Sequence, residues 1–207
     1  MAHWDVIVIG LGGVGSAASY HLAAAGRRVL GIDRFPPAHD RGSSHGQTRI
    51  IRQAYFEHPA YVPLLRRAYQ LWEDLEAGTN SKLFYRTGLV EMGPADGIVI
   101  PGVLHSAREY DLPVDAMSVA EIKQRWPGIS ADGHWNAVVE KDAGFLRVED
   151  CVLGHLELAR QSGASCVHGV SVRNWEVDGS GVAEATDHGV EHAERVVIAG
   201  GPWSGQL

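Results

Sequence analysis

From residue 5 the chain reads Asp5-Val-Ile-Val-Ile9 and then Gly10-Leu-Gly12-Gly-Val-Gly15. The apolar run is too short for a helix and lacks polar alternation, so it predicts a parallel strand buried on both faces. The glycines that follow have the spacing G-x-G-x-x-G, which is typical of a tight turn between a strand and a helix. In such a turn the second glycine lets backbone N–H groups approach a pyrophosphate, and the third lets the helix pack closely on the strand. We therefore expect an anion at the N-terminus of the helix.

The residues that follow complete this unit. Gly26 ends an alanine-rich helix where a C′ glycine is expected, and a second strand follows over residues 29–33. Asp33 falls 23 residues after Gly10, at the end of that strand, where a carboxylate can accept both hydroxyls of an adenosine ribose. The order of elements predicts a dinucleotide site for NAD or FAD. NADP is disfavoured, because the carboxylate would repel its 2′-phosphate.

The composition excludes several classes of protein. A length of 207 residues with 45% hydrophobic residues suffices for one large domain or two small ones. A net charge of −7, without any basic run of five residues, gives no support for nucleic-acid binding. Residues 1–5 carry no Lys or Arg and glycines interrupt the apolar run, so neither a signal peptide nor a membrane segment is indicated. We expect a cytoplasmic protein.

The cysteines and histidines give no metal or redox motif. Cys151 and Cys166 are the only cysteines, and they stand too far apart for a C-x-x-C pair. Among eleven histidines only His188 and His192 are four residues apart. They flank a glycine in an expected turn between strands, so a helical metal-binding face is disfavoured. We expect no metal site.

The segment after the second strand is rich in side chains that can take part in ligand binding or catalysis. It reads Gly42-Ser-Ser-His45-Gly-Gln-Thr-Arg49-Ile-Ile-Arg52 and combines two hydroxyls, an imidazole and two guanidiniums. Its last five residues are β-branched enough for a short strand. A loop at this point leaves the carboxyl edge of the sheet, where ligands of open α/β sheets bind. We expect this segment to lie close to the bound cofactor.

The same segment, together with Ala54-Tyr55 and Tyr61-Val-Pro-Leu64, resembles the monomeric sarcosine oxidase and N-methyltryptophan oxidase family of FAD-dependent amine oxidases. That family shows Gly-Ser-His-His-Gly-Asp-Thr-Arg here, and Ser44 and Gln47 stand in place of its first His and its Asp. The resemblance continues along the whole chain. It implies an α/β fold with a Rossmann-like FAD-binding domain of glutathione-reductase type and an interleaved α+β substrate domain.

The resemblance also implies a division of the chain. Residues 1–83 would form the first part of the FAD-binding domain, residues 84–145 part of the substrate domain, and residues 146–207 the continuation of the FAD-binding domain. Family members need roughly as many residues again, so the chain corresponds to a truncated N-terminal half. The cysteine that anchors flavin and the lysine associated with oxygen would lie beyond Leu207.

By this resemblance the activity is oxidation of a secondary amino acid, N-methylated or cyclic, to an imine, with O2 reduced to H2O2 by a monomeric enzyme. The partners are a small amino-acid substrate and O2. The implied cofactor-binding residues are Gly10, Gly12, Gly13, Val14, Gly15, Asp33, Arg34, Ser43, Ser44, Arg49, Val172, Gly200 and Trp203. The implied catalytic residues are His45, Arg49 and Arg52. Arg52 would recognise the substrate carboxylate through its two-pronged guanidinium, with Arg49 as the alternative.

Two alternatives stay open at this point. An NAD-dependent dehydrogenase would share the first 33 residues, although it has no need for the cluster from His45 to Arg52. The chain could also be a non-catalytic fragment.

The remaining elements follow from periodicity and turn signals. Helices are predicted over residues 58–76, 102–110, 119–125 and 148–162. Strands are predicted over residues 86–94, 164–172 and 195–203, with a small meander over residues 171–190.

Overall fold

The computed structural model describes residues 3–179 and 181–206. The chain divides into two compact units: Met1–Thr48, Leu75–Leu83 and Arg147–Leu207 form the first, and Arg49–Asp74 and Phe84–Leu146 form the second. This division departs from the expected domains in one stretch, because residues 49–74 pack within the second unit. The assignment of a cofactor role to one unit and a substrate role to the other stays a prediction.

The first unit is built on a six-stranded mixed sheet with the order β10-β11-β12-β1-β2-β9. Its strands are β1 (His3–Ile9), β2 (Val29–Asp33), β9 (Ser165–His168), β10 (Val172–Asp178), β11 (Gly181–Thr186) and β12 (Gly189–Ile198). The strands β12, β1, β2 and β9 pair in parallel, whereas β10, β11 and β12 form an antiparallel meander. The predicted order of strand, glycine turn, helix and strand is confirmed.

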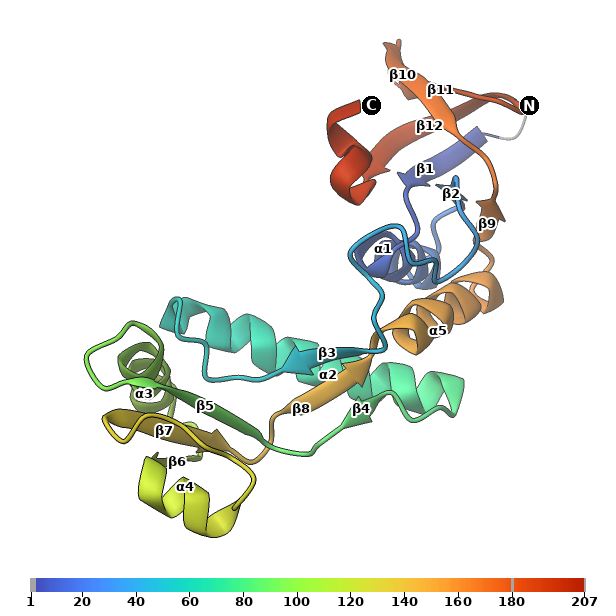
Figure 1. Cartoon of the computed structure of the whole chain (residues 1–207). Helices are drawn as coiled ribbons and strands as arrows, with labels where there is room; N and C mark the ends of the chain where they lie inside the picture. The colour runs from blue at the N-terminus through green and yellow to red at the C-terminus, as the bar shows by residue number, and fades with distance from the viewer. Residues whose placement is uncertain (1–2, 180, 207) are drawn as a thin grey trace. The chain divides into compact units, whose positions relative to one another are not determined.

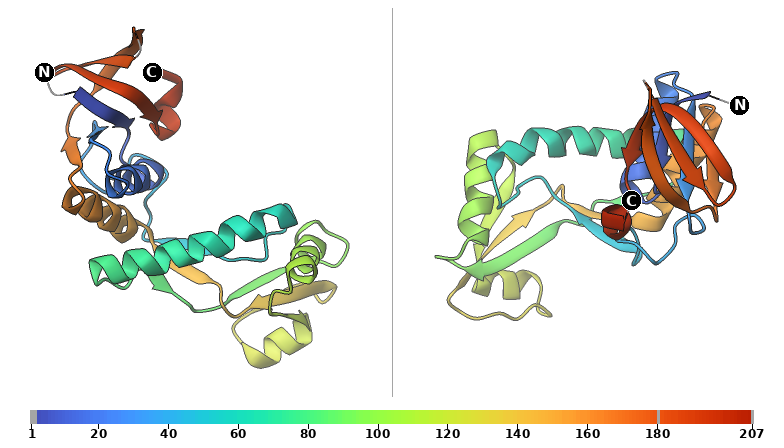
Figure 2. Two further views of the ribbon diagram at one scale, coloured as in Figure 1. Left: turned by 180° about the vertical axis from the view of Figure 1, so that it is seen from behind. Right: turned by 90° about the horizontal axis from the view of Figure 1, so that it is seen from above.

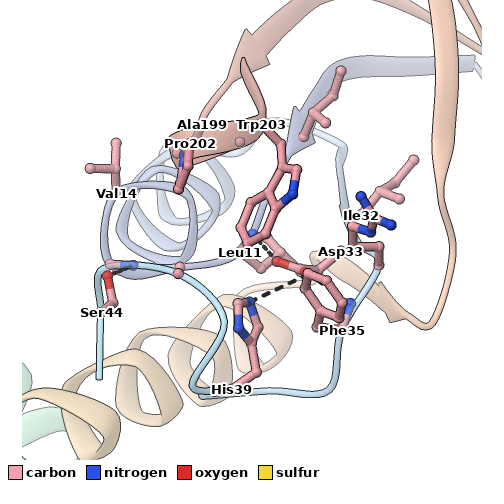
Figure 3. A pocket seen from close by; sticks show the side chains of 18 of the residues that line it. Leu11, Val14, Ile32, Asp33, Phe35, His39, Ser44, Ala199, Pro202 and Trp203 are labelled. Atoms are coloured by element: carbon pink, nitrogen blue, oxygen red, sulfur yellow. Dashed lines mark hydrogen bonds and ion pairs between the residues drawn. The ribbon is translucent and has the colours of Figure 1, made fainter. Parts of the chain in front are cut away.

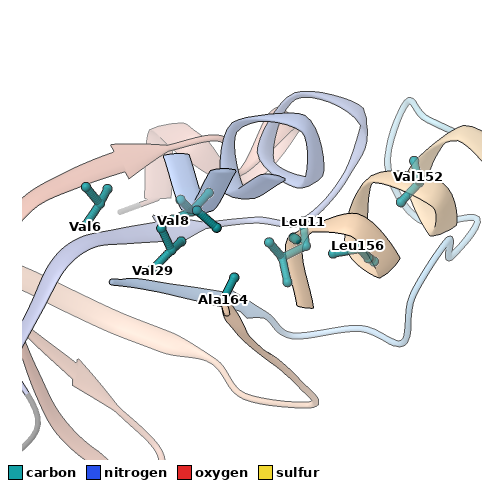
Figure 4. Packing of buried hydrophobic residues seen from close by; sticks show 9 residues of the cluster. Val6, Val8, Leu11, Val29, Val152, Leu156 and Ala164 are labelled. Atoms are coloured by element: carbon teal, nitrogen blue, oxygen red, sulfur yellow. The ribbon is translucent and has the colours of Figure 1, made fainter. Parts of the chain in front are cut away.

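Two helices cover one face of the parallel strands. They are α1 (Gly13–Ala24) and α5 (Val148–Gln161), which lie side by side in Figure 2. Val6 and Val8 of β1 pack with Leu156 of α5 in the cluster that Figure 4 shows. Alternate residues Ile7 and Ile9 pack on the opposite face of the sheet. Burial on both faces explains why β1 is a continuous apolar run, since each such side chain contributes about 1.5–3 kcal/mol when fully buried.

The second unit contains two small sheets. The first joins β3 (Thr48–Ile51), β8 (Gly144–Arg147) and β4 (Phe84–Tyr85), and the second joins β5 (Leu89–Pro94), β7 (Trp135–Glu140) and β6 (Val114–Ser118). The helices α3 (Val99–Tyr110) and α4 (Val119–Arg125) belong to this unit. The helix α2 (Val62–Thr79), which begins after the 3-10 turn Pro59–Tyr61, belongs to it as far as residue 74, and its residues 75–79 belong to the first unit.

The strand β7 separates two layers of this unit. Val138 packs in a cluster with residues of α3, whereas Ala137 and Val139 pack with Ile122 of α4. Figure 1 accordingly shows α3 and α4 on opposite sides of the sheet β5-β7-β6. No helix within the described ranges is both long and apolar enough to cross a membrane.

Several boundaries differ from the predicted ones. The helix predicted over residues 58–76 is α2 over Val62–Thr79, and the strand predicted over residues 86–94 is β5 over Leu89–Pro94. The strand predicted over residues 164–172 was wrong, because Gly169 adopts a positive φ of 77° and separates β9 from β10. The strand predicted over residues 195–203 is the end of β12, which is followed by a 3-10 helix over Gly201–Gln206. The helix α3 begins three residues earlier than predicted, because Pro101 lies in its first turn, where no intrahelical N–H is needed.

A buried histidine at the α1 and α5 contact makes stability depend on pH. His155 is 5% exposed, and its ring centroid lies 6.3 Å from that of His21. Burial, reinforced by the nearby His21, lowers the pKa of His155 to about 4. The unfolded chain therefore binds a proton at His155 near pH 6.5, whereas the folded chain binds it only near pH 4, so this histidine contributes a loss of stability as the pH falls through this window.

We predict that His155→Gln, which keeps a donor of similar size, removes up to about 3 kcal/mol of the fall in unfolding free energy between these two pH values. Denaturant unfolding at several pH values measures this. His188→Gln, in an exposed hairpin turn, is the matched control and leaves the pH dependence unchanged. The same pH dependence in His155→Gln and the parent protein would contradict the assignment.

Candidate nucleotide-binding site

A cavity of about 340 Å³ opens in the first unit where its parallel strands end. Its walls come from the turn after β1, the end of β2 with the following loop, the segment after β9 and the segment after β12. β1 lies between β2 and β12, and the chain passes from β1 through α1 to β2. The carboxyl ends of the parallel strands are where open α/β sheets bind nucleotides.

The glycine turn after β1 lines the cavity. A Cβ atom on Gly15 would lie 1.7 Å from the carbonyl oxygen of Gly10, and one on Gly10 would lie 2.5 Å from that of Ala199. These two glycines are therefore required by packing. A Cβ atom on Gly12 would meet only the Ser44 hydroxyl, at 3.6 Å. The space in front of Gly12 is thus open, as close backbone approach to a pyrophosphate would require.

The carboxylate of Asp33 is tied to the same turn. Its Oδ2 accepts a hydrogen bond of 2.7 Å from the Leu11 N–H, and its Oδ1 accepts one of 2.9 Å from the Phe35 N–H. The Nε2 atom of His39 lies 3.8 Å from Oδ1. Because an ionised carboxylate has about four acceptor positions, Asp33 keeps capacity for ribose hydroxyls. It also has a positioning role in the turn that the sequence pattern does not show.

The loop after β2 supplies a polar group at the start of α1. Gly12 is the N-cap residue and has no side chain with which to cap the helix. The hydroxyl of Ser44 instead accepts a hydrogen bond of 2.9 Å from the Gly13 N–H. Ser44 thus satisfies one of the free N–H groups of the first turn, at the point where an anion is favoured.

Aromatic rings form one wall of the cavity. The ring centroids of Phe35 and Trp203 lie 5.4 Å apart, and Figure 3 shows both side chains beside Asp33. The guanidinium of Arg34 lies 5.0 Å from the Phe35 centroid, and the His39 ring lies 4.8 Å from it. Such rings offer flat, weakly polar surfaces suited to a purine base. Sequence reasoning found Arg34 and Trp203 but missed Phe35 and His39, which stand in an irregular stretch without a motif.

The structure brings most of the predicted cofactor-binding residues together. Those that line the cavity are Gly10, Gly12, Gly13, Val14, Asp33, Arg34, Ser43, Ser44, Val172, Gly200 and Trp203. Gly15 packs against Gly10 instead. His45, Arg49 and Arg52 are not among the lining residues, and their predicted roles remain predictions. Within the described ranges no group of three or more His, Cys, Asp or Glu residues is placed to hold a metal ion.

The backbone next to His45 is fixed by Glu149, in the first turn of α5. The Glu149 Oε1 atom accepts hydrogen bonds from the N–H groups of Gly46 at 2.7 Å and Gln47 at 3.1 Å. Gln47 has a positive φ of 66°, which is uncommon for a residue with a side chain. Desolvation acts to raise the pKa of Glu149, but these hydrogen bonds outweigh it and hold the pKa below its usual value. Sequence reasoning missed Glu149, for which the only signal is an acidic residue at a helix start.

Arg52 lies in the second unit among acidic and aromatic side chains. Its Nε atom is 3.2 Å from Oε1 of Glu91, and its guanidinium lies 4.5 Å from the centroid of the Tyr55 ring. Burial raises the pKa of Glu91 to about 7, although Arg52 acts in the opposite direction. Close by, Glu140 accepts hydrogen bonds from the N–H groups of Gln53 at 2.7 Å and Ala54 at 3.0 Å.

The fold and the cavity are those of a nucleotide-binding α/β protein. The chain belongs to the family described as FAD dependent oxidoreductase, whose model matches residues 5–207. It is 45% identical over 204 residues to monomeric sarcosine oxidase of Streptomyces avermitilis, covering 99% of this chain and 53% of that protein. It is 38% identical over 200 residues to N-methyl-L-tryptophan oxidase of Salmonella typhimurium, covering 97% and 54%. The chain thus spans about half the length of these relatives.

Solved structures support the same fold. NikD, described as an unusual amino acid oxidase essential for nikkomycin biosynthesis, superposes with a TM-score of 0.90 at 25% identity, over 100% of this chain and 53% of that one. Glycine oxidase from Geobacillus kaustophilus gives a TM-score of 0.83 over 100% of this chain and 58% of that one. At 23% identity the second likeness concerns the fold alone. The predicted family and fold class are confirmed.

We predict that Gly15→Ala destabilises the first unit by about 3 kcal/mol, because its methyl group cannot fit against the Gly10 carbonyl. The shift in denaturant midpoint measures this. Gly128→Ala is the control, since no atom lies within 4 Å of a Cβ atom at that position. Equal midpoints for the two variants would contradict the packing described for the turn.

Proposed function

We propose that the protein is an FAD-dependent oxidase of secondary amino acids, N-methylated or cyclic, which converts the C–N bond to an imine while O2 is reduced to H2O2. The observation that carries the proposal is the cavity at the glycine turn, with open space before Gly12 and the fixed carboxylate of Asp33. Sarcosine oxidase and N-methyl-L-tryptophan oxidase among the relatives favour this activity over a nicotinamide-dependent one.

The residues present fit the adenosine diphosphate part of FAD. The N-terminus of α1 favours the pyrophosphate, and Asp33 offers acceptor positions to the ribose hydroxyls. The rings of Phe35 and Trp203, with Val172 on the same cavity, offer apolar surface to the adenine. Ser43, Gly200 and Arg49 would hold the rest of the cofactor. When bound, FAD supplies the redox chemistry, taking two electrons from the substrate and passing them to O2.

Arg52 would bind the substrate carboxylate. An amino acid brings an anion into a partly buried site, where an unpaired charge is costly. A guanidinium can donate parallel hydrogen bonds to both carboxylate oxygens. The Tyr55 ring packed against Arg52 limits the directions in which its guanidinium can point. Arg49 is the second candidate for this role, and His45 would lie near the reacting groups.

We also propose that the protein acts as a cytoplasmic monomer that does not bind nucleic acid, as its net charge of −7 favours. Size-exclusion chromatography with light scattering tests the oligomeric state.

We predict that Asp33→Asn raises the dissociation constant of FAD roughly 10- to 100-fold, because hydrogen bonds to a charged acceptor are worth about 1.5–3 kcal/mol. Flavin retained after dilution and dialysis measures this. Asp40→Asn is the matched control, on the same loop with a side chain that is 87% exposed, and retains FAD. Full retention by Asp33→Asn would count against the ribose assignment.

We predict that Arg52→Lys raises KM for the amino acid while FAD content stays unchanged, because Lys keeps the charge but loses the two-pronged geometry. Steady-state kinetics with flavin absorbance as the internal standard measure both quantities. An unchanged KM, or loss of FAD, would transfer the carboxylate role to Arg49 or another residue.

A further inference from the structure

Arg52 is already engaged with acidic side chains of its own unit. Oε1 of Glu91, on β5, lies 3.2 Å from the Arg52 Nε, and Oε1 of Glu57 lies 3.9 Å from an Nη atom. The Arg52 and Glu91 side chains are 17% and 13% exposed, whereas Glu57 is 43% exposed. Glu91 is therefore the partner whose charge is least screened by water.

The cluster contains more acidic groups than basic ones. Glu140, on β7, is 3% exposed and interacts electrostatically with both Arg52 and Glu91. Desolvation raises the pKa of Glu140, although the N–H groups of Ala54 and Gln53 act against this. Glu57, Glu91 and Glu140 thus face one guanidinium. Buried like charges disfavour full ionisation, so the cluster favours the retention of one proton.

Glu91 is the residue best placed to hold that proton. Glu140 already accepts two backbone hydrogen bonds that favour its ionised form. Within the described part of the chain Glu91 accepts no comparable hydrogen bond from a backbone N–H, and the Nε atom of Arg52, 3.2 Å from the Glu91 Oε1, makes no hydrogen bond. Burial, with further repulsion from Glu140 and Glu57, raises the pKa of Glu91 to about 7.

The guanidinium keeps donors for a second carboxylate. It carries five N–H groups in a fixed fork, and Glu91 approaches it at Nε. The contact of 3.9 Å to Glu57 is too long for a hydrogen bond. A substrate carboxylate can therefore meet the outer Nη pair while Glu91 stays in place. It would then add another negative charge beside Glu91.

We propose that Glu91 is the internal counter-ion of Arg52, and that binding of a carboxylate substrate is coupled to uptake of one proton from solvent by Glu91. The proposal rests on the proposed role of Arg52 in substrate recognition. Without substrate and above about pH 7, ionised Glu91 neutralises the buried guanidinium. With substrate, the incoming carboxylate neutralises it and Glu91 becomes a neutral acid. Glu91 thereby sets how strongly the site holds an anion at a given pH.

The test compares the enzyme with Glu91→Gln, which keeps the shape of the side chain but cannot take up the proton. With sarcosine as the substrate, we expect KM of the parent enzyme to rise about tenfold more than that of Glu91→Gln between pH 6 and pH 8. Glu109→Gln is the matched control, on the exposed face of α3 in the same unit with a side chain that is 48% exposed, and it follows the parent. Parallel KM profiles for the parent and Glu91→Gln would overturn the coupling.

A second measurement does not depend on activity. The pKa of Glu91 is raised in the folded protein from 4.5 to about 7, so the folded state binds more protons than the unfolded state in this window. Glu91 therefore contributes a loss of stability as the pH rises from 4.5 to about 7, opposite in sign to the contribution of His155 over nearly the same window. Glu91→Gln lacks this contribution of Glu91. A smaller loss of stability with rising pH in Glu91→Gln than in the parent, without turnover of any N-methylated or cyclic amino acid, would refute the proposed function while supporting Glu91 as the counter-ion. Identical pH dependence of unfolding in both proteins would overturn the counter-ion itself.

Discussion

The hydrogen bond of 2.7 Å from the Leu11 N–H to the Asp33 carboxylate is the contact on which the candidate site depends. It joins the glycine turn after β1 to the end of β2, and Asp33 is only 7% exposed. Two backbone hydrogen bonds of 2.8 Å, from Gly10 N–H to Ile32 and from Ala199 N–H to Ile9, fix the same edge of the sheet. The carboxylate that we propose as the acceptor for the ribose is thus held in place before a ligand binds, which would reduce the entropy lost on binding.

The parts of the fold that sequence predicts well are those specified by neighbouring residues. The run from Asp5 to Asp33 contains its own strand, turn and cap signals, and the structure follows it closely. The strands β6, β7 and β8 were not predicted, because short segments such as Trp135–Glu140 acquire their form from pairing with distant strands. The contact of Glu149 with Gly46 spans 103 residues, so no local pattern could indicate it.

For Arg52, the sequence and the structure show different interactions. Resemblance assigns it to the substrate, whereas the structure shows it paired with Glu91 and covered by Tyr55. The two findings are compatible, because a largely buried guanidinium requires a counter-ion whenever substrate is absent. Arg52 could be identified from the sequence, but its partner Glu91 could not. Glu91 stands on a strand whose alternation of side chains gives no reason to expect a buried carboxylate.

We propose that the cavity in the first unit recognises the adenosine diphosphate half of FAD. Competition binding can test this, with FAD titrated against ADP and against FMN, which lacks the adenosine part. We predict that ADP displaces FAD from the protein and that FMN does not bind appreciably. Binding of FMN as tight as that of FAD, or failure of ADP to compete, would contradict it.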